Sequence, residues 1–222
     1  MTDLVLILEA STDHASVALV SNKQIVAEQS VQGRRPETGE RTEGIVPAIV
    51  ACLADAHRTS HELSAVVCSG GPGGFTSLRT AASIGKGICF ALQIPMYAVP
   101  TLEIIVADAA RADGIYVAAL DAGRGEYYAS VVEVRDGLVC PGKPVALLDA
   151  DTLSRFVAEQ RATLVGPILG RNGAPRAGAV VRLLDRVVRS GPVDIDHWEP
   201  AYGRLAEAQV KWEATHGRPL TT

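Results

Sequence analysis

The chain has 222 residues, of which 47% are apolar and 21% charged, a composition typical of a globular protein with a sizeable core. Its formal net charge of −4 and its aromatic content of 5% argue against independent nucleic-acid binding, which usually relies on a basic patch and on stacked aromatic rings. The apolar run at residues 4–8 is too short for a membrane span or a signal peptide. We therefore expect a cytoplasmic protein that makes no contact with a membrane and meets nucleic acid only inside a complex.

Strand-like and helix-like segments alternate along the first half of the chain. Runs of apolar residues bounded by turn residues predict strands, and apolar residues at helical spacing predict helices. The predicted strands are residues 4–10, 15–21, 24–31, 65–69 and 96–99. The predicted helices are residues 40–53, 76–92 and 101–110.

The second half repeats this order of elements in a shorter form. The predicted strands are residues 115–121, 126–134, 143–148 and 163–165. The predicted helices are residues 151–160, 180–189 and 201–215. A repeated order without a repeated sequence indicates two lobes of one mixed α/β architecture, with a boundary near residues 110–114.

The four cysteines lie far apart, and none belongs to a CxxC pair. Their spacing predicts neither a zinc site nor a disulfide framework. Three of them lie in apolar segments, so we expect buried, reduced thiols. The four are Cys52, Cys68, Cys89 and Cys140.

A glycine-rich loop at residues 70–74 lies between a predicted buried strand and a predicted helix. Free N–H groups at such a helix start can bind a phosphate, and Thr76 or Ser77 could cap the helix. The loop matches neither a Walker A nor a Rossmann pattern. Two interpretations stay open from the residues alone, a phosphate site and a tight structural turn.

Two pairs of polar residues invite a catalytic interpretation. His57 and His61 are four residues apart, but Arg58 follows the first, where a metalloprotease needs Glu. We expect two surface histidines near the end of a helix. Asp121 and Arg124 are similarly expected to form a charged turn and not a catalytic pair.

Residues 70–92 resemble the glycine-rich signature of the TsaB (YeaZ) family. Other landmarks of that family follow along the chain, although Glu9 and Arg41 replace its usual Asp and His. The matched motif positions are Gly71, Pro72, Gly73, Phe75, Thr76, Leu78, Arg79, Asp121, Arg124, Tyr202 and Arg204.

This resemblance implies the actin-like ATPase fold, with two ribonuclease-H-like lobes whose mixed sheets are flanked by helices, the second lobe being reduced. The lobes would be residues 1–110, carrying the partner-binding helices, and residues 111–200, followed by a C-terminal helix and tail at 201–222. The family is a degenerate relative of the catalytic subunit TsaD. Thr101 and Ile105 stand where TsaD has its two metal-binding histidines, so we expect no metal and no catalytic residue.

The function implied by the resemblance is that of a non-catalytic scaffold and activator. The chain would pair with TsaD during threonylcarbamoylation of the adenosine next to the anticodon in tRNAs that read ANN codons. TsaE would be a further partner, TsaC a functional link, and a homodimer could form without TsaD. No cofactor is expected, which leaves open weak nucleotide binding or a nucleotide at the subunit interface. The alternatives are a small actin-like or sugar-kinase-like ATPase, a protease and a self-associating structural protein.

The partner surface is expected on the two long helices of the first lobe. From the sequence alone, packing of their apolar stripes against the chain's own core is favoured, because such stripes usually face a core. The resemblance favours a shared surface with TsaD. The expected contact residues are Arg41, Ile45, Ile49, Leu53, Leu78, Arg79, Ala82 and Gly85.

Overall fold

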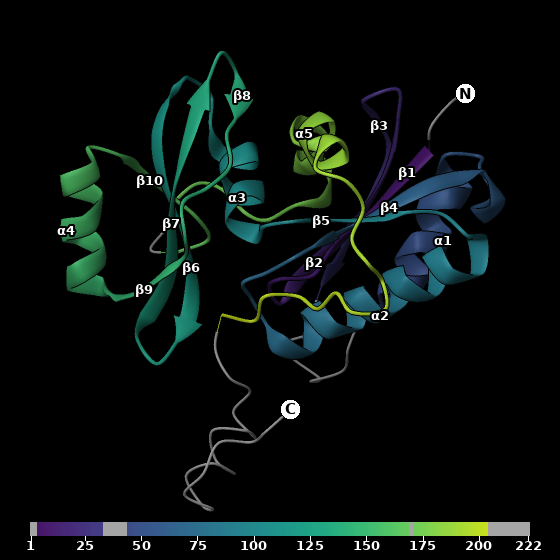
Figure 1. Cartoon of the computed structure of the whole chain (residues 1–222), viewed down its shortest axis with the longest axis horizontal. Coiled ribbons are helices and arrows are strands. Elements are labelled where there is room, and N and C mark those ends of the chain that lie inside the picture. The colour runs from purple at the N-terminus through teal and green to yellow at the C-terminus, as the bar shows by residue number, and fades with distance from the viewer. Residues whose placement is uncertain (1–3, 33–43, 169–170, 204–222) are drawn as a thin grey trace, which may run out of the picture.

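The computed structural model describes residues 4–32, 44–168 and 171–203, which form two lobes, each built on a five-stranded sheet (Figure 1). The first sheet has the strand order β3-β2-β1-β4-β5. Strands β1, β2 and β3 pair antiparallel, while β1, β4 and β5 run parallel. The strands are β1 (Leu4–Glu9), β2 (His14–Ser21), β3 (Gln24–Gln32), β4 (Leu63–Ser69) and β5 (Met96–Val99).

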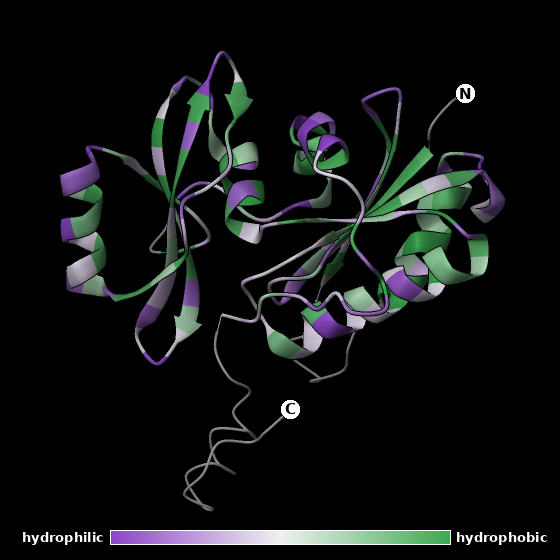
Figure 2. Cartoon of the chain, viewed as in Figure 1, coloured by the Kyte–Doolittle hydropathy of each residue, from purple (hydrophilic) through white to green (hydrophobic). Residues whose placement is uncertain are grey.

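Two helices, α1 (Ile45–Asp55) and α2 (Phe75–Leu92), cover one face of this sheet. Each turns an apolar stripe toward the strands, as helical periodicity requires of a helix on a sheet (Figure 2). A single 3-10 turn, η1 (Ser60–Glu62), leads into β4. The sheet and the two helices enclose a core that includes three buried cysteines.

The second sheet has the order β10-β6-β7-β8, and β9 also pairs with β7. Its strands are β6 (Gly114–Gly123), β7 (Glu126–Arg135), β8 (Leu138–Val139), β9 (Ala146–Asp149) and β10 (Thr163–Val165). Helix α4 (Ala150–Gln160) packs on the outer face of this sheet, and Asp149 caps it by accepting a hydrogen bond from the Thr152 N–H. The architecture is therefore the mixed α/β pair of lobes that the order of elements predicts.

Each segment that connects the two sheets packs on the sheet that it does not follow in sequence. Helix α3 (Thr101–Ala109) follows the first sheet in sequence but packs on the second. The turn η2 (Ala177–Arg182) and helix α5 (Leu184–Arg189) follow the second sheet but pack on the first. One buried apolar cluster, from Ile7 in β1 to Val132 in β7, runs through this joint. Proximity in space therefore does not follow the expected sequence boundary near residue 110.

Several element limits differ from the prediction. Helix α1 begins at Ile45, five residues after the expected start, and residues 33–43 lie outside the described part of the chain. The expected helix at 180–189 is a 3-10 turn followed by a short α-helix. Strand β8 was not predicted, and the expected helix at 201–215 lies almost wholly outside the described residues. Within the described ranges, no helix is both long and apolar enough to cross a membrane.

Candidate functional site

The glycine-rich loop at residues 70–74 is bonded to its own chain on several sides. The Gly70 N–H donates to the Val99 carbonyl at 2.7 Å, and the Gly74 N–H donates to the Ser11 carbonyl at 2.8 Å. The Gly70 carbonyl accepts from the Ala201 N–H, also at 2.8 Å. The N–H groups of both Gly70 and Gly74 are thus already bonded, which favours the structural turn over the phosphate site.

Two glycines of this loop leave no room for a side chain. Gly71 has a φ of +85°, and a Cβ there would lie 2.1 Å from the Ala201 carbonyl oxygen. A Cβ at Gly73 would lie 2.3 Å from the Ser11 carbonyl oxygen. Helix α2 then starts at Phe75 with Gly74 as its N-cap, so the expectation that Thr76 or Ser77 caps it is wrong. Because the helix begins one residue earlier, both lie within its first turn.

Residues 191–203, which we call the strap, are hydrogen-bonded to the glycine-rich loop through Ala201. The strap runs from α5 past α2 and ends beside the second lobe (Figure 1). The Val193 N–H donates to the Met96 carbonyl at 2.8 Å, and the Tyr202 carbonyl accepts from the Tyr128 hydroxyl at 3.2 Å. The strap therefore joins the loop, through Ala201, to the second lobe, through the family-motif residue Tyr202.

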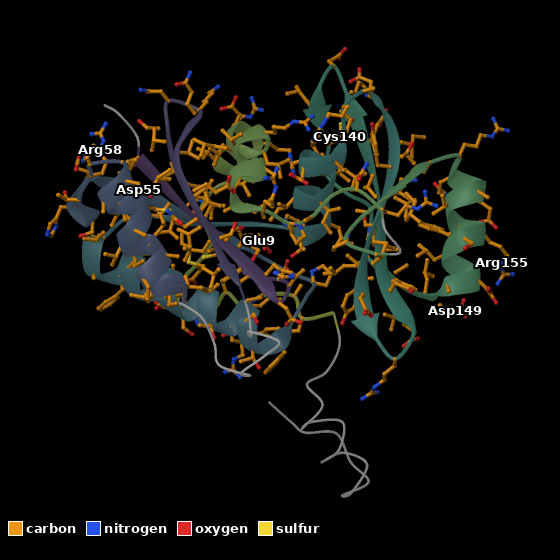
Figure 3. All side chains as sticks on the ribbon, turned by 180° about the vertical axis from the view of Figure 1, so that it is seen from behind. Glu9, Asp55, Arg58, Cys140, Asp149 and Arg155 are labelled. Carbon is orange, nitrogen blue, oxygen red and sulfur yellow. The ribbon has the colours of Figure 1, made fainter. Side chains whose placement is uncertain are left out.

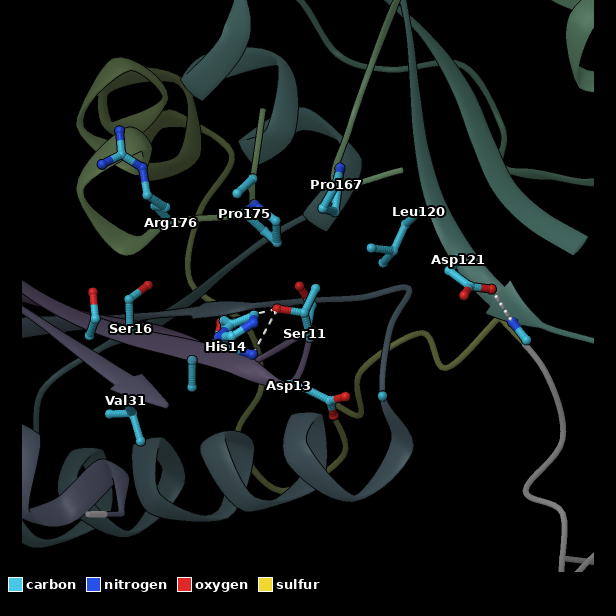
Figure 4. Close-up of a pocket in the computed structure, with 16 residues that line it drawn as sticks. Ser11, Asp13, His14, Ser16, Val31, Leu120, Asp121, Pro167, Pro175 and Arg176 are labelled. Atoms are coloured by element: carbon cyan, nitrogen blue, oxygen red, sulfur yellow. Dashed lines mark hydrogen bonds between the residues drawn. The ribbon is translucent and has the colours of Figure 1, made fainter. Parts of the chain in front are cut away.

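A cleft of about 670 Å³ lies between the lobes (Figure 4). The β1–β2 turn lines one side, and the end of β6 with the segment 174–176 lines the other. Asp121, at the end of β6, accepts a hydrogen bond from the Gly123 N–H at 2.7 Å, so it stabilises its own turn. The cleft also carries Asp13, His14 and Arg176, of which Arg176 is paired with Asp108. The charged side chains that line it are thus mixed in sign, and its one arginine is already paired.

Glu9 ends strand β1 in the middle of the molecule, whereas the other charged side chains labelled in Figure 3 lie at its periphery. It is 1% exposed, and its Oε1 accepts hydrogen bonds from the N–H and the hydroxyl of Ser11. Its Oε2 has no hydrogen-bond partner among the residues that the structure describes. Burial raises the pKa of Glu9 to about 7, although the bonds from Ser11 act in the opposite direction. The carboxyl group therefore faces the interior and does not line the cleft.

Other positions considered from the sequence lie apart from this cleft. Thr101 and Ile105 are fully buried in α3, and within the described part of the chain the Thr101 hydroxyl has no hydrogen-bond partner. His57 and His61 are both exposed, His57 two residues after α1 and His61 within η1. Among the residues the structure describes, no three His, Cys, Asp or Glu side chains are grouped to hold a metal ion.

The expected contact residues on α1 and α2 mostly face inward. Five of the eight are buried against the first sheet or within its core, and Leu53 is half-buried. Arg79 is exposed and lies over the Phe75 ring, with its guanidinium carbon 5.3 Å from the ring centroid. Arg41 and Arg204 lie outside the described residues. The five buried residues are Ile45, Ile49, Leu78, Ala82 and Gly85.

The outward faces of the same helices carry other residues. On α1, Val46 and Val50 are 53% and 62% exposed, one helical turn apart. On α2, Phe90 is 71% exposed. Apart from Phe90 and Arg79, the exposed residues of α2 are small, and we call this row of small residues the crest of α2. They are Thr76, Thr80, Ser83, Gly87 and Ala91.

None of these outward residues was among the contact residues expected from the sequence. Their signal is present in the sequence, since Thr76, Thr80, Ser83 and Gly87 recur at helical spacing on the side opposite the buried stripe. An apolar stripe indicates a buried or binding face because it is hydrophobic, whereas a row of small and partly polar residues gives no such indication.

Comparisons with known proteins agree with the motifs. A family model described as TsaD, tRNA N6-adenosine threonylcarbamoyltransferase, matches residues 16–139, more than half of the chain. The tRNA threonylcarbamoyladenosine biosynthesis protein TsaB of Bacillus subtilis is 26% identical over 231 residues, which cover 94% of this chain and 97% of that protein. An uncharacterized protein of Mycobacterium tuberculosis is 31% identical over 182 residues, which cover 81% of this chain and 76% of that protein.

The solved structure of YeaZ from Pseudomonas aeruginosa has the same fold, with a TM-score of 0.70 and 23% identity over 90% of this chain and 99% of that one. The lobes and the family match define a TsaD-like protein with the actin-like ATPase fold. Within that class, the chain belongs to the TsaB (YeaZ) family. The resemblance inferred from the glycine-rich signature is thereby confirmed.

Proposed function

We propose that this chain is a non-catalytic scaffold and activator subunit in the biosynthesis of threonylcarbamoyladenosine in tRNA. It pairs with TsaD, which transfers the threonylcarbamoyl group, and works in the cytoplasm with TsaE and with the product of TsaC. Its contact with tRNA is made through the complex. The observation that carries this proposal is the open outer face of α1 and α2 in a member of the TsaB family.

The shape of that face suits a second helix. Small side chains let a neighbouring helix approach closely, and, apart from its own stretch of helix backbone, no atom of the described residues lies within 4 Å of the place where a Gly87 Cβ would stand. Val50 on α1 and Phe90 on α2 supply exposed apolar area on the outer faces of the same two helices. A small crest together with exposed apolar side chains is the kind of surface that becomes the buried centre of a protein–protein interface.

The first-strand and glycine-loop residues support a non-catalytic role. The Glu9 carboxyl is enclosed and accepts its hydrogen bonds from Ser11. Gly70 and Gly74 already donate their N–H groups to protein carbonyls. The enclosed carboxyl and the two bonded N–H groups support the proposal that no magnesium ion or phosphate group binds at these positions.

The test is a reconstituted modification reaction that follows labelled threonine into tRNA. TsaC, TsaD and TsaE from the same organism are combined with and without this protein. Loss of incorporation on omission, restored by adding the protein back, supports the activator role. Unchanged incorporation without it contradicts the proposal.

The cleft between the lobes favours one alternative, a small actin-like ATPase. Isothermal titration of the protein with ATP and magnesium separates the two functions. An ATPase must bind its nucleotide in the absence of TsaD, whereas the scaffold does not need to.

A further inference from the structure

The joint between the lobes is held by polar side chains as well as by the apolar core. Three arginines, Arg176, Arg182 and Arg186, lie along the segment 174–189, most of which packs on the first sheet. Each donates hydrogen bonds to α3, which packs on the second sheet. We call these three residues the arginine clasp.

Arg186 makes the most enclosed of these contacts. Its Nη2 donates to Oε2 of Glu103, a side chain that is only 6% exposed. The other oxygen of Glu103 accepts from the Gly142 N–H at 2.8 Å, in the connection between β8 and β9. One buried carboxylate thus joins α5, α3 and the edge of the second sheet.

Arg182 binds the end of α3. Its Nη1 donates to the carbonyls of Ala107 and Ala110 at 2.6 and 3.0 Å, and its Nη2 to the Gly137 carbonyl at 3.4 Å. A cation at the C-terminus of a helix satisfies carbonyls that lack partners within the helix. The same guanidinium reaches the turn between β7 and β8, so it too spans the joint.

Arg176 completes the clasp at the rim of the cleft. Its Nε donates to Oδ1 of Asp108 at 2.8 Å, and Oδ2 of Asp108 accepts from the Ala174 N–H at 3.1 Å. Asp108 lies in the last turn of α3. The contact therefore fixes the place where the chain returns from β10 toward the first sheet.

We infer that the arginine clasp holds the two lobes as one rigid body, so that the cleft between them keeps a fixed width. The chain passes between the sheets twice, from β5 to α3 and from β10 to η2. A hinge needs connections that few contacts cross. Here directional hydrogen bonds cross both connections, and a change of the interlobe angle would leave the buried Glu103 carboxylate without Arg186.

Stability alone is a poor explanation for the clasp. A buried ion pair is often no more stabilising than well-packed apolar residues of similar volume. The hydrogen bonds of the clasp, unlike apolar contacts, are strong only within a narrow range of distances and angles. The clasp therefore suits the fixing of a relative orientation, and this inference stands whether or not the chain binds TsaD.

The test measures the distance between the lobes in the full chain. Nitroxide labels are placed at A54C on α1 and A158C on α4, two exposed helix positions, in a C140S background that removes the half-buried cysteine. Double electron–electron resonance then gives the distribution of interlobe distances. The comparison is between this parent, the variant R182M/R186M, and the control R155M at an exposed arginine of α4.

We expect one narrow distribution for the parent and the control, and about a twofold broadening for R182M/R186M. Near-ultraviolet circular dichroism establishes that each sample is folded. Should the double variant not fold, R182M alone is measured in the same way. A folded clasp variant with an unchanged distribution, or a parent that is already broad, would overturn the inference.

Discussion

The rings of Phe75 and Tyr202 are in contact, with their centroids 4.5 Å apart and their planes inclined by 48°. Phe75 is the first residue of α2, and Tyr202 lies near the end of the strap. The Tyr202 hydroxyl also donates to Glu199 at 2.7 Å, and Glu199 lies 3.8 Å from Lys86 of the same helix. The strap is thus attached to α2 by an aromatic contact and a short polar chain, next to the surface proposed to bind a partner.

We expect Tyr202→Ala to lower the free energy of unfolding by about 1–3 kcal/mol, because it removes buried aromatic area and the ring contact with Phe75. Tyr202→Phe keeps both and loses only the hydroxyl bond to Glu199, so it should cost less than about 1 kcal/mol. Urea unfolding of the two variants and the parent measures these differences. Equal losses for both variants would mean that the ring contact contributes little.

Replacement by alanine should have opposite effects on stability at Gly71 and at Gly87. Gly71→Ala places a Cβ against the Ala201 carbonyl at a φ of +85°, and we expect a loss of more than about 2 kcal/mol. Gly87→Ala lies in the middle of α2 with open space around it, and we expect a gain of about 0.5–1 kcal/mol. Urea unfolding again provides the measurement. A Gly71→Ala protein as stable as the parent would contradict the close fit of strap and loop.

Glu9 makes the stability of the fold depend on pH. Because its pKa rises from 4.5 to about 7 on folding, the native state binds more protons than the unfolded chain between these values. The contribution of Glu9 to the stability of the fold should therefore be most favourable below about pH 4.5. It should fall by roughly 3 kcal/mol as the pH rises to 7, and change no further above that.

The variant Glu9→Gln isolates this contribution, since an amide of the same shape does not ionise. We expect it to be more stable than the parent at pH 8, with a difference that shrinks toward zero at pH 4.5. Glu159→Gln, at an exposed position of α4, is the control and should give no such trend. A Glu9→Gln difference that is the same at both pH values would show that folding does not shift the pKa of Glu9.

Most strands and helices could be predicted from local patterns. Strand β10 and helix α4 match their expected limits to within one residue, because alternation and a clear N-cap mark them. The packing of α3 on the second sheet, and of η2 and α5 on the first, could not be predicted, since both segments are apolar on several sides and their partners are distant in sequence. The roles of Glu103 and Arg186 were missed for the same reason, as the two lie 83 residues apart.

The sequence also could not tell which face of each helix is buried. Ile49 and Ile45 lie on the buried stripe of α1, whereas Val50 and Val46, adjacent to them in sequence, are exposed. A run of neighbouring apolar residues does not specify its inward members until the sheet beneath is placed. Polar substitution at Ile49 or Leu78 would therefore destabilise the fold itself, and a weakened TsaD complex in such variants would not identify the interface.

The partner surface can be tested by substitutions that add bulk or charge where the fold has room. We expect Gly87→Leu on the crest of α2, and separately Val50→Glu on α1, to reduce TsaD binding at least tenfold. Neither substitution should lower the unfolding free energy by more than about 1 kcal/mol, since both positions are exposed. Leucine also has a higher helix propensity than glycine. The matched control is Ala158→Leu, which adds similar bulk to the exposed side of α4 on the other lobe. Binding is measured by titration with TsaD, and activity by incorporation of labelled threonine into tRNA. If Gly87→Leu and Val50→Glu bind TsaD as the parent does while Ala158→Leu does not, the contact surface lies on the second lobe.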